Sequence, residues 1–227
     1  MYSHNRSAAR VCEEPERIEN RMLARQKRVA PVLKLAKPGL THHQIVEGLQ
    51  QGRSDCAMAL YEQYSELINR LVWRILGADG EHDDVVQQVF LCALSSIHSL
   101  REPSALESWM VGITINTVKR ELRNRTIRRI FHINQENPDL NLDPQTPNAP
   151  LIVRRFYQAV SELKSDDRIA FTLRFVEGYT LGETAVACAC SLATIKRRLA
   201  HAKRSFLLQA KRDPILAPWI EGGVHEP

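Results

Sequence analysis

Residues 178–206 predict two short helices joined by a turn, and the second helix is basic. Apolar side chains recur in this helix at steps of three and four, so they form one stripe: Leu192, Ile195, Leu199, Ala202 and Phe206. The rest of its surface is cationic, with no acidic residue among Lys196, Arg197, Arg198, His201, Lys203 and Arg204. Such a helix suits a phosphate-lined groove. The pattern predicts a helix-turn-helix, with solvated charges on an ordinary surface helix as the alternative.

The start of the basic helix is expected to lie nearest the bases. Ser191 is a suitable N-cap, which would bring Ser191, Ala193 and Thr194 close to base edges in the major groove.

The positive charge of the chain is small in total but concentrated in two segments. The 227 residues are 44% hydrophobic and 25% charged, a globular composition sufficient for one or two domains, and the net charge is only +5. A second cationic cluster is broken only by Glu121 and comprises Lys119, Arg120, Arg123, Arg125, Arg128 and Arg129. Two separate basic helices indicate two contacts with one polyanion.

Helical periodicity runs through most of the chain, and the predicted fold is all-α. Residues 1–40 are polar and interrupted by proline, which predicts a poorly ordered or loosely helical extension. Two small helical domains are predicted over 41–130 and 151–212. Their predicted helices cover 42–50, 55–76, 83–97, 104–128, 151–163, 166–177, 181–189 and 192–212. Ser104 and Glu107 have the spacing of a capping box at the fourth helix.

The segments outside these domains are rich in proline. Residues 131–150 contain many Asn and Asp residues without periodicity, which predicts a flexible linker. Pro214 and Pro218 are expected to end the order, leaving 213–227 as a C-terminal tail.

No convergent catalytic set is recognisable, so the sequence predicts neither an enzyme nor a metal or cofactor site. Gly-rich phosphate loops and hydrolase motifs do not occur. The five cysteines are odd in number and lack zinc-finger spacing, so buried thiols in a reducing cytoplasm are expected. A secretory signal and a stretch of transmembrane length are not found.

The predicted helix over 83–97 has two kinds of face. Val86, Val89, Phe90 and Ala93 can line a core, whereas another face carries Asp84, Gln87, Gln88 and Leu91. A mixed polar and apolar stripe suits a protein partner, and a solvated face is the alternative.

The predicted helix over 104–128 places Trp109 and Asn116 seven residues apart, on similar sides. Aromatic and amide groups beside the cations Lys119, Arg120 and Arg123 can hold unstacked single-stranded bases. The alternative is that Trp109 belongs to the core.

Taken in order, these segments resemble a bacterial RNA polymerase sigma factor of the extracytoplasmic-function (ECF) group. The resemblance covers about residues 41–208. It depends on LYEQY at 60–64, DDVVQQVFLCAL at 83–94, SWMVGITINTVKRELR at 108–123, LRFVEGYTLGETA at 173–185 and SLATIKRRLAHAK at 191–203. The resemblance implies promoter-specific initiation, with core RNA polymerase and promoter DNA as partners and no small-molecule substrate. It leaves open whether an anti-sigma factor also binds.

Site residues follow from the same resemblance. It implies that polymerase binds Asp84, Gln87, Gln88, Phe90 and Leu91. It implies that the minus-ten element and strand opening involve Trp109, Asn116, Lys119, Arg120 and Arg123. It implies that the minus-thirty-five element is read by Ser191, Ala193, Thr194, Lys196, Arg197, Arg198, His201 and Lys203.

Two features depart from the family pattern. Ala189 stands where the turn of the helix-turn-helix usually has glycine, which would cost about 1 kcal/mol if the residue needs a positive φ. The N-terminal extension is also longer than the family usually carries.

A conventional helix-turn-helix regulator that acts without polymerase is the second hypothesis. Its first domain would serve dimerisation or sensing and would need a ligand pocket, whereas this first domain carries a polar stripe and a basic helix with Trp109.

Overall fold

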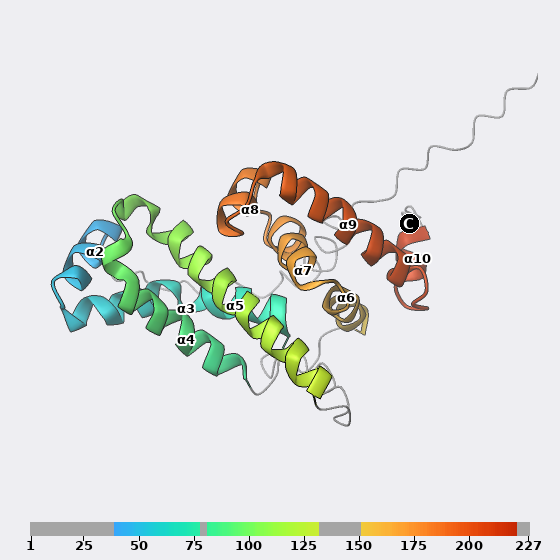
Figure 1. Ribbon diagram of the computed structural model, residues 1–227, viewed down its shortest axis with the longest axis horizontal. Coiled ribbons are helices and arrows are strands. Elements are labelled where there is room, and N and C mark those ends of the chain that lie inside the picture. Colours follow the sequence, from blue (N-terminus) through green and yellow to red (C-terminus); the bar gives the residue numbers. More distant parts are fainter. Residues whose placement is uncertain (1–38, 78–80, 132–150, 222–227) are drawn as a thin grey trace, which may run out of the picture.

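The computed structural model describes residues 39–77, 81–131 and 151–221, and within these ranges every regular element is a helix. Figure 1 shows two groups of helices side by side, α2 to α5 and α6 to α10. The predicted all-α fold with a C-terminal helix-turn-helix is therefore confirmed. Most of the N-terminal extension and of the predicted linker lies outside the described residues.

The first domain is built on two long helices. These are α3 (Ser54–Leu76) and α5 (Leu106–Phe131), which pack with α2 (His42–Gln50) and α4 (His82–Ser96). The α4 positions predicted to line a core are buried, including Val89 and Ala93, and the apolar stripe of α3 with Leu60 and Ile68 is buried with them. Helical amphipathicity was therefore sufficient to predict this core.

The start of α5 differs from the prediction. Ser104 lies inside a short 3-10 helix, Pro103–Ala105 (η2). The backbone N–H of Ser104 donates a hydrogen bond to the carboxylate of Glu102 at 3.4 Å. The predicted capping box of Ser104 with Glu107 is therefore wrong. Proline at the first position favours a separate tight turn before α5 begins at Leu106.

The second domain packs around three phenylalanines. Phe156 comes from α6 (Leu151–Ser161), Phe171 from α7 (Ser165–Phe171) and Phe206 from α9 (Leu192–Ala210). Their ring centroids lie 5.1 to 6.4 Å apart. After α7 the chain continues through a π-helical turn, Thr172–Val176 (η3), to α8 (Leu181–Ala187).

Order continues beyond the predicted end of this domain. Leu216 is only 2% exposed and packs in the phenylalanine core, and a short helix, α10 (Ala217–Glu221), follows. The expectation that Pro214 and Pro218 end the order is wrong, because proline is tolerated in a turn and in the first turn of a helix.

The two domains share a core. Ile169, Leu173 and Ala187 of the second domain are buried in the same apolar cluster as α3 and α5 of the first. In Figure 1, α7 and α8 lie next to α5, which agrees with the contacts between these helices. The domains are therefore packed against each other.

Candidate nucleic-acid and polymerase interfaces

The helix-turn-helix is fixed by two caps and one strained turn. The Thr180 hydroxyl accepts a hydrogen bond from Glu183 N at 3.2 Å, and the Glu183 carboxylate accepts one from Thr180 N at 2.8 Å. This reciprocal capping box starts α8. Hydrogen bonds from the backbone N–H and the side chain of Thr180 to the carboxylate hold the pKa of Glu183 below its usual value.

The turn between α8 and α9 has the geometry that the sequence suggested. Ala189 has a φ of 48°, in the left-handed region that favours glycine. Ser191 then caps α9, since its hydroxyl accepts a hydrogen bond from Thr194 N at 3.2 Å. The prediction that Ser191 is the N-cap is confirmed.

The apolar stripe of α9 is buried where predicted, except at its first residue. Ile195, Leu199, Ala202 and Phe206 are in the core, whereas Leu192 is exposed. The opposite face exposes Ser191, Ala193, Lys196, Arg197 and His201 and half-exposes Thr194, Arg198 and Lys203. Neither Arg197 nor Arg198 lies inside the protein, so the surface required by the DNA-binding hypothesis exists.

Arg198 and His201 are held by carboxylates of α7. Arg198 Nη2 lies 2.6 Å from Asp166 Oδ2, and His201 Nδ1 lies 2.6 Å from Asp167 Oδ2. These pairs orient the middle of α9, whereas Lys196 and Arg197 project without an ion pair to any described residue.

The middle of α5 presents a second cationic face. Asn116, Arg120 and Arg123 are exposed, and Lys119 is half-buried with its Nζ 2.8 Å from Asp166 Oδ1. Trp109, one turn from the start of α5, is half-buried against the first core. The structure therefore brings the four polar residues together and places the Trp109 ring largely in the core.

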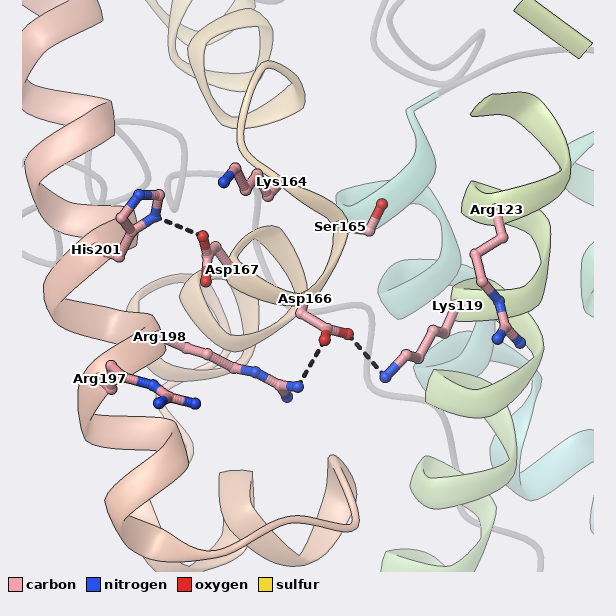
Figure 2. A pocket seen from close by; sticks show the side chains of 9 residues that line it. All are labelled: Lys119, Arg123, Lys164, Ser165, Asp166, Asp167, Arg197, Arg198 and His201. Atoms are coloured by element: carbon pink, nitrogen blue, oxygen red, sulfur yellow. Dashed lines mark hydrogen bonds and ion pairs between the residues drawn. The ribbon is translucent and has the colours of Figure 1, made fainter. Parts of the chain in front are cut away.

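The cationic faces of α5 and α9 meet across a cleft of about 580 Å³ (Figure 2). Lys119 and Arg123 line it from α5, and Arg197, Arg198 and His201 line it from α9. Lys164, Ser165, Asp166 and Asp167 complete its lining. Asp166 lies between the two helices and contacts both.

The C-terminal part of the predicted α5 cluster has a different role. Arg128 forms a double hydrogen bond with Glu81 at 2.5 and 2.9 Å, and Arg125 pairs with Glu121 at 3.1 Å. The Arg128 guanidinium lowers the pKa of Glu81. Arg125 Nε also lies 3.8 Å from Glu81 Oε2, so both arginines connect α5 to the start of α4. The cationic cluster is therefore divided between an outward face and a structural network.

On α4, the predicted docking residues fall into three environments. Asp84, Gln87 and Leu91 are exposed, and Gln88 is half-buried and donates to Cys92 Sγ at 3.3 Å. Phe90 is only 8% exposed, so it belongs to the core. This confirms the prediction that Phe90 can line the core, because the helical phase that exposes Leu91 turns Phe90 inward. Its contribution to polymerase binding stays a prediction.

Sequence reasoning missed an apolar surface beside α4. Tyr61 of α3 is 52% exposed and its ring centroid lies 4.9 Å from that of Phe90. Met58, Leu91 and Leu94 are exposed on the same two helices. The i, i+3 spacing of Met58 with Tyr61 and of Leu91 with Leu94 was the available signal. We call Met58, Tyr61, Gln87, Leu91 and Leu94 the α3–α4 face.

Groups for other chemistry do not gather in the described part of the chain. In residues 39–77, 81–131 and 151–221 no three His, Cys, Asp or Glu side chains are placed to hold a metal ion. None of the described helices is both long and apolar enough to cross a membrane.

Comparison with known proteins identifies both domains. The model of Sigma-70 region 2 matches residues 60–127, and that of Sigma-70, region 4 matches residues 154–206. The chain is 28% identical over 188 residues to the ECF RNA polymerase sigma-E factor of Haemophilus influenzae, covering 78% of this chain and 98% of that protein. It is 27% identical over 173 residues to the RNA polymerase sigma-H factor of Pseudomonas aeruginosa, covering 71% and 90%.

Solved structures support the same fold. The sigma factor RpoE in complex with the anti-sigma factor NepR from Bartonella quintana has a TM-score of 0.55 at 20% identity, covering 67% of this chain and 95% of that one. CnrH in complex with the cytosolic domain of CnrY has a TM-score of 0.53 at 16% identity, covering 74% and 96%.

A helical domain with an exposed α3–α4 face and a second domain with a helix-turn-helix define a transcription initiation factor. The chain belongs to the ECF group of bacterial sigma factors, which bind core RNA polymerase and direct promoter-specific initiation. The alternative of a regulator that acts without polymerase does not account for the region 2 domain.

Proposed function

We propose that the two domains divide initiation between them, with residues 41–130 binding polymerase and the minus-ten element and residues 151–212 binding the minus-thirty-five element. The observation that carries this proposal is α9, a capped helix whose apolar stripe is buried and whose opposite face exposes Lys196 and Arg197.

In the upstream complex, the start of α9 enters the major groove. Ser191, Ala193 and Thr194 lie nearest the base edges, and the helix N-terminus faces the phosphates. Lys196, Arg197, Arg198, His201 and Lys203 then contact phosphates or bases along the groove.

In the downstream complex, α5 binds separated strands. Asn116 offers an amide to an unstacked base, while Lys119, Arg120 and Arg123 neutralise the backbone. Trp109 contributes the exposed edge of its half-buried ring and otherwise supports the helix from the core.

Core polymerase binds the α3–α4 face, with Asp84 and Gln88 at its edge. Exposed Tyr61 and Leu91 supply apolar area, and Phe90 supports Tyr61 from beneath. The function is that of a cytoplasmic, non-catalytic subunit. An anti-sigma factor is a further proposed partner, since the similar sigma factor RpoE is in complex with the anti-sigma factor NepR.

The experiment compares two variants that each remove two exposed cations from the second domain, one pair within α9 and one pair just after its end. Lys196→Ala with Arg197→Ala should lower transcription from the cognate promoter on the order of tenfold or more, since both groove contacts are lost. Lys211→Ala with Arg212→Ala, at the end of α9, loses the same charge away from the groove and should change transcription little. Promoter fragments selected with reconstituted holoenzyme supply the template for run-off transcription.

Co-purification with core polymerase separates the two domains in this experiment. Both double variants should still co-purify with core polymerase, because the substituted residues lie outside the α3–α4 face that is proposed to bind it. Loss of polymerase by the Lys196 and Arg197 variant would contradict the division of roles.

A further inference from the structure

Three cations that line the cleft between α5 and α9 have no ion pair with any residue of the described part of the chain. They are Arg123 of α5, Lys164 just before α7 and Arg197 of α9, and all three side chains are exposed (Figure 2). Because no carboxylate of the described residues neutralises them, these three side chains are available to an external anion.

The paired residues of the cleft show how close its two walls are. Asp166 Oδ1 lies 2.8 Å from Lys119 Nζ of α5, and Asp166 Oδ2 lies 2.6 Å from Arg198 Nη2 of α9 (Figure 2). One carboxylate therefore reaches from wall to wall. A phosphate group is of comparable size and binds the same cations. The cleft is thus narrow enough for a phosphate chain to contact both walls.

The lining of the cleft is cationic and lacks apolar side chains. It contains five Lys and Arg residues but only two carboxylates, which gives a net charge of +3 with His201 neutral. None of the nine described lining residues is aliphatic or is Phe, Tyr or Trp. Sites for a nucleobase or another planar ligand contain such side chains. The cleft therefore suits a dense anion and offers little to a base.

We propose that this cleft binds a condensed phosphate chain, with Arg123 on one wall and Lys164 and Arg197 on the other. The chain is either inorganic polyphosphate or the triphosphate of a nucleotide. Neighbouring phosphates of such a chain share an oxygen, so several negative charges fit into the cleft of about 580 Å³. A nucleic-acid strand separates its phosphates by a sugar, so it places fewer charges in the same space.

The proposed phosphate site overlaps the proposed DNA faces without depending on them. Arg123 and Arg197 belong to both, so a bound phosphate chain and DNA would compete for these two cations. Lys164 belongs to neither DNA face. The test of the phosphate site contains no DNA, so its result is independent of whether the DNA faces are assigned correctly.

Isothermal titration calorimetry of the full chain with sodium tripolyphosphate, at about 0.1 M salt, measures binding directly. Wild type should show one saturable site. Arg123→Gln with Lys164→Gln should weaken the affinity on the order of tenfold or more, since two charge-assisted contacts are lost. Lys211→Gln with Arg212→Gln removes the same charge from exposed positions outside the cleft and should bind as wild type does.

The substitutions in the cleft replace exposed side chains, so the helical content by circular dichroism should stay that of wild type. If the double variant does not fold, Lys164→Gln alone is compared with Lys211→Gln. Equal weakening in the cleft variant and its control overturns the proposal, because the anion would then respond to net charge alone. Absence of saturable binding to wild type overturns it as well.

ATP distinguishes the two sources of the phosphate chain. Weaker binding of ATP than of tripolyphosphate assigns the cleft to inorganic polyphosphate, and equal binding shows that the triphosphate of a nucleotide also fills it. Tighter binding of ATP overturns the assignment to a phosphate chain, because the base would then supply affinity that this lining does not explain.

Discussion

Two single residues decide the geometry of the helix-turn-helix, and both are readable from the sequence. Ser191 caps α9 through a local hydrogen bond, so its role needs no knowledge of the rest of the fold. Ala189 lies in the turn, and its φ of 48° shows that this position adopts the left-handed conformation that glycine would adopt without strain. Local backbone chemistry therefore predicts this part of the site well.

Ala189→Gly should stabilise the protein by about 1 kcal/mol, because glycine adopts a positive φ without the strain that alanine carries. Ala200→Gly makes the same chemical change at an exposed position inside α9 and should destabilise by about 1 kcal/mol. Urea unfolding monitored by circular dichroism measures both. A loss of stability in both variants would show that the turn is not strained at Ala189.

The charges of α5 illustrate what residue-level reading could not predict. Lys119, Arg120, Arg123, Arg125 and Arg128 form one run in the sequence, yet Arg128 pairs with Glu81, which is 47 residues away. Such long-range pairs depend on how α4 and α5 pack, and periodicity contains no information about them. A count of the basic residues in this run therefore gives a larger positive charge than α5 presents to a partner.

At the scale of elements, the existence of each helix was predictable and its ends were less so. The predicted range 42–50 coincides with α2, which a capping box of Thr41 and Gln44 begins. The predicted range 166–177 instead divides into α7 and the π-helical turn η3, which is buried at Thr172 and Leu173. Ends defined by local caps were predictable, whereas changes imposed by tertiary contacts were not.

The capping box of α8 predicts a specific acid sensitivity. Because hydrogen bonds from Thr180 hold the folded-state pKa of Glu183 below its usual 4.5, the carboxylate stabilises the fold fully above that value. This stabilisation is lost as pH falls through the folded-state pKa. Glu183→Gln should thus lower the free energy of unfolding at pH 7, and its difference from wild type should shrink toward about pH 3.

Urea unfolding at several pH values measures this effect. Glu62→Gln, an exposed glutamate of α3, is the matched control and should run parallel to wild type. A pH-independent gap between wild type and the Glu183 variant would mean that ionisation of this carboxylate does not support the cap.

The α3–α4 face gives a second prediction for elements. Gln87→Ala with Leu91→Asp should weaken binding to core polymerase about tenfold or more, since an exposed apolar contact is replaced by a charge that needs desolvation. Leu208→Asp, at an exposed leucine of α9, introduces the same charge elsewhere and should leave the affinity unchanged. Fluorescence anisotropy of labelled protein titrated with core polymerase measures both affinities. If the Gln87 and Leu91 variant binds polymerase as tightly as wild type, the α3–α4 face is not a polymerase-binding surface.

At the scale of the molecule, the sequence predicted two domains but not their packing. The apolar positions of the predicted helix over 166–177 read as the core of their own domain, and nothing local distinguishes Ile169 and Leu173, which pack in the first domain. Likewise, Glu177 reads as a surface residue but is buried between Arg70 and Arg74. Contacts between domains combine residues about a hundred positions apart, so they follow from the tertiary arrangement alone.

The shared core predicts that loss of packing at the domain interface lowers the local stability of both domains in the free protein. Leu173 lies in the cluster formed mainly by the first domain, whereas Leu163 lies only in the phenylalanine core of the second. Each leucine truncated to alanine should destabilise its surroundings by about 2–5 kcal/mol. Leu173→Ala should therefore reduce amide protection in α3 of the first domain as well as in α7, because its side chain is buried in the apolar cluster that α3 helps to form. Leu163→Ala should reduce amide protection in α6 and α7 but leave local protection of α3 close to wild type.

Native-state hydrogen exchange resolved by mass spectrometry distinguishes these patterns of amide protection. Identical patterns in the two variants, with α3 unaffected by either, would mean that the domains are independent in solution and that the shared cluster contributes little to stability.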